Sequence, residues 1–505
     1  MRIHKTARYA VAASAVLGIT LTACGGSGGS SASSSGGWNK DATVNIGSLY
    51  EPQNLDNTAG GGQGVTEALN GNVYEGLFKL TDDGKVENLL ARSYTKSADG
   101  LTYTFTLRDG VKFHSGRELT SADVKYSLRK VLADDSQSAR KSNLEVVKDI
   151  ATPDAHTVKV TLSQKSISFV YNLSYVWIID SQAKNLKTTE DGTGPYELGK
   201  WTRGSALSLK RFAGYWGTPA TNAQVVFHYF KDATALNNAL LTNAVDVVTS
   251  EQSPDALDQF KSNQNYKVND GNSTTKLLLA FNDKAKPFTD VKVRKAVSEA
   301  IDDKKLLESI WGGYGKLIGS MVPPTDPWYE DLTGVNAYNV ADAKKLLAAA
   351  GYAKGFSFTL DTPNYDPHPT VATFVKSQLA KVGITVKINT ITPDEWYTKV
   401  YKNHDFTATL QEHVNDRDLT WYGNPDFYWG YDNKQVTAWV KEAEEASTTG
   451  EQTALLKKVN EQTAKDAASD WLYLYPQIVV ASTKVSGYPL NGLNSQFYAY
   501  AIKKG

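Results

Sequence analysis

Cysteine is almost absent from this chain: Cys24 is the only one among 505 residues. The sequence after it can therefore form no internal disulfide and no thiolate metal site, so packing alone has to stabilise the fold. An excess of charge is also missing, because 54 Lys and Arg residues balance 54 Asp and Glu residues. Without a basic field to attract phosphates, we expect no nucleic-acid partner.

Long apolar runs are missing too. The apolar stretch at about residues 10–21 is shorter than the roughly 20 residues that span a bilayer. It follows Arg2, Lys5 and Arg8 and precedes small residues, as in a secretory signal. Residues 1–23 are therefore predicted to be a signal peptide. Leu21-Thr22-Ala23-Cys24 resembles the bacterial lipobox, which predicts lipid (palmitate) attachment at Cys24.

Residues 24–40 contain the low-complexity run GGSGGSSASSSGG, at 25–37, which has no apolar side chain larger than Ala. Such a composition buries nothing and predicts a flexible tether. A lipid followed by a tether indicates a globular domain held at the extracellular face of a cell membrane, of the Gram-positive type. Gly25–Gly29 also matches a nucleophile-elbow pattern, but no strand precedes it and no helix follows it. The sequence thus gives no support for a hydrolase.

Removing the first 23 of 505 residues leaves 482, which predicts two or three lobes. Residues 101–108 alternate between apolar and polar and predict a half-buried strand. Thr120 and Asp123 form a capping-box pattern that begins a helix extending to Val131. A Gly-rich turn at 60–64 is expected to lead into a helix over 65–77.

The second half alternates strands and helices. Asp290 and Asn339 are predicted helix caps, and Gly351 a helix stop. A strand at 356–360, a helix at 371–382 and a strand at 384–388 then follow in order. This alternation predicts an α/β layer, which binds ligands near the carboxyl ends of its strands.

The block from Ala91 to Val124, with DGLTYTFTLRDGVKFHSG at its centre, resembles the signature of extracellular solute-binding proteins of the oligopeptide/dipeptide/nickel type, family 5. These proteins are the capture subunits of ABC importers. Further landmarks of the same family follow the family order, and the resemblance extends from about Thr43 to the C-terminus. They are Asn72–Leu77, Gly192–Tyr196, Tyr215–Gly217, Phe281-Asn282, Val293–Ala296, Ala300–Asp302 and Ala350–Tyr352.

The resemblance implies an α/β, periplasmic-binding-protein-like fold of type II, cluster C. Two α/β lobes would close on a ligand by hinge motion, and a β-rich insertion would form an extra lobe. It also implies a monomer without enzymatic activity or cofactor, working with ABC permease and ATPase subunits. The boundaries we expect are 41–78, 192–275 and 477–505 for lobe I, 79–191 for the insertion lobe II, and 276–476 for lobe III.

Two segments are expected to face the ligand. The first is 51–64, in which the glycine-rich run 60–64, with Gly62 and Gln63, would bring the backbone close to the ligand. The second segment, 410–432, combines charges with six large aromatic side chains. In peptide-binding relatives an acidic residue four positions before a Pro pairs with the ligand's amino terminus. Here that position, before Pro425, holds Trp421, so Asp416 or Asp418 would take the role, with Arg417 between them.

That departure leaves the cargo open. A short peptide is the first hypothesis, because it is the commonest ligand of the family. An oligosaccharide stacked on Trp421, Tyr422 and Trp429 is the alternative, and a nickel chelate is a weaker one. The histidines are scattered and predict no metal site. A receptor that senses a peptide without transporting it would have the same sequence features.

Overall fold

The computed structural model describes residues 38–60 and 62–505, and residues 38–505 form one compact unit. The predicted signal peptide, Cys24 and most of the tether lie outside the described residues. Within the described part, no helix combines the length and the apolar character needed to cross a membrane.

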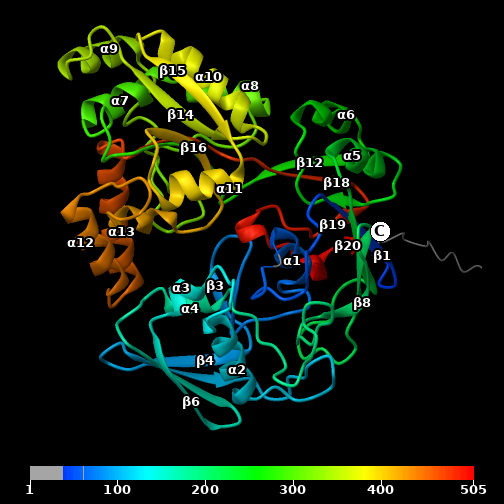
Figure 1. The fold of residues 1–505 in the computed structure, drawn as a ribbon. Helices are drawn as coiled ribbons and strands as arrows, with labels where there is room; N and C mark the ends of the chain where they lie inside the picture. Colours follow the sequence, from blue (N-terminus) through cyan, green and yellow to red (C-terminus); the bar gives the residue numbers. More distant parts are fainter. Residues whose placement is uncertain (1–37, 61) are drawn as a thin grey trace, which may run out of the picture. The chain divides into compact units, whose positions relative to one another are not determined.

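A seven-stranded sheet contains the first strand of the fold, in the order β12-β18-β11-β1-β10-β9-β8. Figure 1 labels its strands β12, β18, β1 and β8. Strand β1 runs parallel to β10 and β11, and the other pairs are antiparallel. On β18, Val479 and Ala481 face one apolar cluster while Ile478 and Val480 face another, as the two-residue period of a strand requires. The strands are β1 (Thr43–Ser48), β8 (Tyr196–Thr202), β9 (Ala206–Arg211), β10 (Gln224–Tyr229), β11 (Val247–Val248), β12 (Tyr266–Gly271) and β18 (Gln477–Ser482). The helices beside them are α1 (Gly62–Leu69), α5 (Ala233–Leu241) and α6 (Leu257–Lys261).

The second sheet is antiparallel and has four strands, in the order β4-β5-β7-β6. On β5, the apolar side chains of Tyr103, Phe105 and Leu107 are buried, which confirms the predicted half-buried strand. The capping box before α2 is also confirmed, because the Thr120 amide and hydroxyl both donate to the Asp123 carboxylate at 2.9 Å. This part of the chain also contains a separate two-stranded sheet of β2 (Phe78–Leu80) and β3 (Val86–Asn88). The other elements are β4 (Ala91–Lys96), β5 (Thr102–Leu107), α2 (Ser121–Leu132), α3 (Lys141–Leu144), β6 (Val147–Asp154), β7 (Thr157–Leu162) and α4 (Phe169–Leu173).

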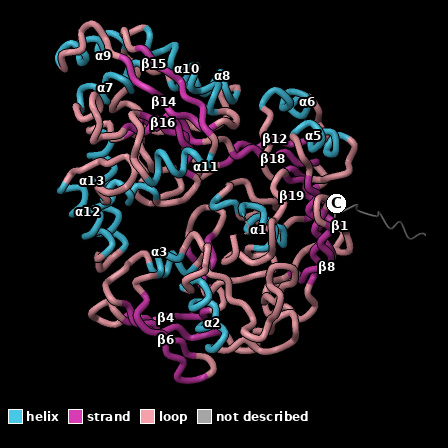
Figure 2. Tube along the Cα trace, viewed as in Figure 1, coloured by secondary structure: helices cyan, strands magenta, loops and turns pink. Residues whose placement is uncertain are grey.

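A mixed five-stranded sheet, β15-β14-β16-β13-β17, is built from the second half of the chain. Strands β14 and β15 are parallel and are joined through α10, so the predicted strand–helix–strand unit is confirmed. Figure 2 shows α7, α9 and α10 beside these strands. The strands are β13 (Lys276–Phe281), β14 (Ser357–Pro363), β15 (Thr385–Ile391), β16 (Ala408–His413) and β17 (Ser469–Leu474). The helices are α7 (Val291–Ala300), α8 (Asp303–Trp311), α9 (Val340–Ala349), α10 (His368–Ala380), α11 (Pro393–Trp396), α12 (Lys434–Glu444) and α13 (Thr449–Lys465).

Two short crossings connect the seven-stranded and five-stranded sheets. One joins β12 to β13 and the other joins β17 to β18. The short strands β19 (Val485–Ser486) and β20 (Lys503–Lys504) then pair near the end of the chain. Such paired crossings are where a hinge between two α/β bodies would bend.

The predicted helix over 65–77 is wrong, because α1 begins at Gly62 and ends at Leu69. Gly71 adopts a left-handed conformation (φ 69°), which interrupts the helix. The buried Asn72 amide donates to the Ala68 and Phe497 carbonyls, at 3.1 and 2.8 Å. Asn72 therefore ties the chain to the C-terminal segment in place of extending the helix.

Candidate ligand-binding site

The charged segment predicted to face the ligand begins where β16 ends, in the five-stranded sheet. After His413 the chain leaves the sheet, and Arg417 takes up a left-handed conformation (φ 56°) before the short 3-10 turn Asp418–Gly423. The polar run thus starts at the carboxyl end of an interior strand, where α/β folds present ligand-binding groups.

Asp416 is buried and makes an ion pair across the molecule. Its carboxylate lies 2.5 Å from Nη2 of Arg140, and it also accepts the hydroxyl protons of Tyr171 and Tyr175. Burial alone would raise the pKa of Asp416, but Arg140 and Tyr171 together hold the pKa below its ordinary value. The Arg140 guanidinium in turn lies 3.7 Å from the centroid of the Tyr175 ring. Asp416 is therefore an ionised carboxylate held by one guanidinium and two hydroxyls.

Asp418 is equally buried but has different partners. Nζ of the buried Lys276 lies 3.0 Å from the Asp418 carboxylate, and Nδ1 of His413 lies 3.6 Å from it. Burial would raise the pKa of Asp418, yet Lys276 and His413 hold it below the ordinary value. Lys276 also donates to the Asn415 carbonyl at 2.5 Å. This pair fixes the loop to β13, and so Asp418 serves the loop's geometry.

Arg417 lies between Asp416 and Asp418 in the sequence, and its guanidinium packs against two aromatic rings. Its guanidinium carbon lies 3.2 Å from the Tyr171 ring centroid and 5.0 Å from that of Trp328. Its Nε has no hydrogen-bond partner among the described residues. Nearby, burial raises the pKa of Asp326 to about 7, although Arg417 opposes this. Arg417 thus offers a donor that no described residue uses.

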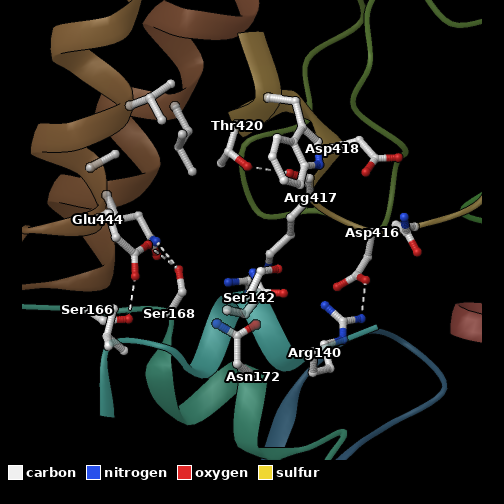
Figure 3. A pocket seen from close by; sticks show the side chains of 18 of the residues that line it. Arg140, Ser142, Ser166, Ser168, Asn172, Asp416, Arg417, Asp418, Thr420 and Glu444 are labelled. Atoms are coloured by element: carbon white, nitrogen blue, oxygen red, sulfur yellow. Dashed lines mark hydrogen bonds and ion pairs between the residues drawn. The ribbon is translucent and has the colours of Figure 1, made fainter. Parts of the chain in front are cut away.

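A cavity of about 280 Å³ brings these groups together (Figure 3). Its volume is near the lower end of ligand pockets, which span roughly 300–1,000 Å³. One wall comes from α3, α4 and the residues before them, and the other from the 415–421 loop, α12 and α13. Opposite Arg417, the Glu444 carboxylate accepts hydroxyl protons from Ser166 and from Ser168, the latter at 2.7 Å. The cavity therefore contains groups of both charge signs.

Of the eight predicted contact residues, Asp416, Arg417, Asp418 and Trp421 line this cavity. Trp421 is 36% exposed and stacks on Phe427 with 4.8 Å between ring centroids. Tyr422 and Trp429 are completely buried and stack on each other at 4.4 Å. Both rings are covered by the core, so neither has a free face for the sugar of the alternative hypothesis.

Gly62 and Gln63 lie at the start of α1 and do not belong to the set of residues that lines this cavity. The close backbone approach expected in the Gly-rich segment occurs at Gly64, where a Cβ would lie 2.3 Å from the Tyr50 carbonyl oxygen. The glycine thus serves packing against the chain itself, and no ligand approach is needed to explain it.

Sequence reasoning missed Arg140, Ser166, Ser168 and Glu444. Arg140, Ser166 and Ser168 lie far from 410–432 in the sequence, while Glu444 lies just beyond it on α12. None of the four carries a motif, so only the folded chain shows that they line the cavity. Across the described residues, no group of three or more His, Cys, Asp or Glu side chains is arranged to hold a metal ion.

Comparisons with known proteins agree with the resemblance seen in the sequence. The model of bacterial extracellular solute-binding proteins, family 5 (Middle), matches residues 85–441. The glutathione-binding protein GsiB of Salmonella typhi is 32% identical over 375 residues, covering 69% of this chain and 69% of GsiB.

Solved structures show the same fold. HbpA2 from Haemophilus parasuis superposes with a TM-score of 0.83 at 21% identity, covering 92% of this chain and all of that one. The oligopeptide-binding protein AppA from Bacillus subtilis, solved with a nonapeptide, gives 0.73 at 21% identity, covering 93% of this chain and all of AppA. The predicted fold class is thereby confirmed. The chain belongs to family 5 of the bacterial extracellular solute-binding proteins, the substrate-binding components of ABC importers, which bind solutes and are not enzymes.

Proposed function

We propose that this chain is a lipid-anchored receptor that captures short peptides outside the cell by hinge closure and delivers them to its permease as a monomer. Lobe I (41–78, 192–275 and 477–505) and lobe III (276–476) would be the hinged bodies, with 79–191 as the insertion. The observation that carries the proposal is the cavity that contains both Arg417 and carboxylates. A peptide brings an ammonium and a carboxylate, and each needs a charged partner once it is buried.

The two ends of such a ligand would find different partners. Asp416 is held ionised, so it can add a ligand ammonium to its existing contacts. The unused Nε of Arg417 is the donor we assign to a ligand carboxylate. The peptide backbone would be met by main-chain groups, which makes recognition tolerant of side chains. Asp418, tied to Lys276, is assigned the role of holding the loop.

The names of the compared proteins support the peptide class. GsiB is described as glutathione-binding, and glutathione is itself a small peptide. AppA was solved with a nonapeptide. For this chain we propose a peptide ligand, and we assign it neither glutathione nor the nonapeptide.

Native mass spectrometry of residues 38–505, purified gently from rich medium, tests the cargo. A spread of bound masses that fragment into amino acids would support the peptide proposal. A single adduct built in hexose or pentose steps would contradict it and favour an oligosaccharide resting on Trp421. A nickel isotope pattern in the adduct would favour the chelate.

Anchoring through Cys24 needs its own test. Replacing the thiol by Cys24→Ser should move the protein from the membrane fraction to the medium and abolish incorporation of an alkyne-tagged palmitate. Retention of the variant in membranes with unchanged labelling would exclude Cys24 as the attachment site.

A further inference from the structure

A second cavity, of about 250 Å³, lies in the part of the chain that forms the five-stranded sheet. It is enclosed by the end of α7, the start of α8, β17 at the sheet edge, and the segments 317–319 and 332–338. It shares no lining residue with the candidate ligand site. Nothing in the proposed capture of cargo uses it.

Two carboxylates in this cavity have atoms without hydrogen-bond partners. Asp470, on β17, is 6% exposed, and its Oδ2 has no partner within the described structure. Oδ1 of Asp303, at the start of α8, is buried and equally unpartnered. Burying a polar atom without a hydrogen bond costs about 1–3 kcal/mol, and more when the group is charged. We therefore expect a bound partner at these two carboxyls.

The Ser298 hydroxyl lies beside Asp470 and lowers the pKa of that carboxyl against the effect of burial, but a hydroxyl brings no positive charge. Lys305 lies 2.9 Å from the neighbouring Asp302, whose carboxylate also caps α8. Lys304 lines the cavity mouth but is exposed and makes no ion pair in the described part of the chain. Burial raises the pKa of Asp470 to about 7, and burial together with Asp470 raises that of Asp303 well above its usual value. Both carboxyls are therefore short of positive charge.

The remaining wall favours an organic cation over a metal ion. The polar Thr333 and Asn336 and the exposed ring of Tyr338 share this wall with four apolar side chains. The apolar side chains are Ile301, Leu317, Ile318 and Leu332. Ca²⁺ and Mg²⁺ need about six oxygen ligands, and no group of three or more His, Cys, Asp or Glu side chains that could hold a metal ion occurs in the described residues. A hydrocarbon chain fits this wall, and an ammonium group fits the carboxylates.

We propose that this cavity binds a small primary alkylammonium ion, with the Asp303 and Asp470 carboxylates accepting from its ammonium group and the apolar wall holding its alkyl chain. The site would be a second ligand site, separate from the cargo. Because the carboxyls have to ionise before they attract a cation, binding should strengthen as the pH rises from 6 to 8. The ammonium stays protonated over this range, as a lysine does.

Calorimetry of the full-length chain with n-butylammonium chloride tests the proposal, with 1-butanol as the neutral ligand of similar shape. We expect saturable binding of butylammonium at pH 8, at least fivefold weaker binding at pH 6, and none of butanol. Asp470→Asn should weaken binding at least tenfold. Asp394→Asn, an exposed carboxylate on α11 outside the cavity, is the matched control and should change nothing.

Three outcomes would overturn the site. They are absence of saturation, equal affinity for butanol, and unchanged affinity in Asp470→Asn. Near-UV circular dichroism and unchanged cargo binding show that a variant is folded. If Asp470→Asn does not fold, Asp303→Asn carries the same expectation, because it removes the other carboxylate.

Discussion

At the scale of single residues, the candidate site is a set of buried charges that already neutralise one another. Asp416 is paired with Arg140, and Asp418 is paired with Lys276. Breaking a buried pair by removing one partner costs about 3–5 kcal/mol, because the other charge stays buried without compensation. The carboxylates therefore stabilise the loop before any ligand arrives, and a ligand ammonium has to join an existing network.

A double-mutant cycle measures this for Asp416. Asp416→Asn and Arg140→Gln should each lower the free energy of unfolding by about 3 kcal/mol, and the double variant by clearly less than the sum. Urea unfolding gives these values. Peptide affinity should also fall more than tenfold in Asp416→Asn, since the ammonium loses its partner. Additive losses of stability would contradict the pairing.

Trp421 separates the two cargo hypotheses at the same scale. If a peptide is bound, Trp421→Ala should change its affinity less than Asp416→Asn does. If a sugar is bound, the order should reverse, because the sugar ring would stack on the exposed face of Trp421. Tyr397→Ala, which removes an exposed aromatic ring that does not line the cavity, is the control.

Glu67 predicts a pH dependence of stability. It is 4% exposed, it accepts a hydrogen bond from the Ser48 hydroxyl at 2.6 Å, and burial raises its pKa to about 7. Between pH 4.5 and 7 the folded protein thus holds a proton that the unfolded chain releases, so this group makes stability fall as pH rises. Glu67→Gln should stabilise the protein by roughly 3 kcal/mol at pH 8 and by little at pH 4.5. Equal effects at both pH values in urea unfolding would contradict the raised pKa.

At the scale of helices and strands, local signals were enough where one residue decides the boundary. Asn339 begins α9 as predicted, because its side-chain oxygen accepts a hydrogen bond from the Asp342 amide at 3.1 Å. The prediction failed at α1, where Asn72 binds the distant Phe497 carbonyl. A helix end set by a tertiary contact leaves no trace in its own sequence.

The sequence did not predict the contact between the start of α4 and helices α12 and α13. The Ser168 hydroxyl donates to Glu444 at 2.7 Å and accepts from Gln452 at 2.9 Å, while the Ile167 amide donates to the Glu444 carbonyl. These bonds join the two walls of the cavity, so losing them should make it easier for the walls to separate. Ser168→Ala should therefore speed dissociation of the bound cargo several-fold, measured by stopped-flow displacement. Ser377→Ala, which removes an exposed hydroxyl bonded within α10, should leave the rate unchanged.

At the scale of the whole molecule, the sequence predicted the fold through its family resemblance and found one wall of the cavity. The aspartates and Trp421 came from a single stretch of unusual composition. The opposite wall, with Arg140, Ser166 and Ser168, comes from residues about 250 positions away, and no periodicity or spacing connects the two. Burial of Tyr422 and Trp429 was equally out of reach, because an aromatic cluster has the same composition in a core and in a binding site.

The contacts across the cavity predict how closure responds to ligand. Cys24 is the only cysteine, so residues 38–505 accept two spin labels without interference, at Lys148→Cys on β6 and Lys344→Cys on α9, both exposed. Because Asp416 and Glu444 bind residues of the 79–191 segment, weakening both contacts should favour a more open state. In Asp416→Asn with Ser168→Ala, pulsed electron resonance should therefore show a longer label distance than in the parent. A saturating peptide should restore the parent distance in the Ser168→Ala single variant. Unchanged distances in the double variant would mean that closure rests on other contacts.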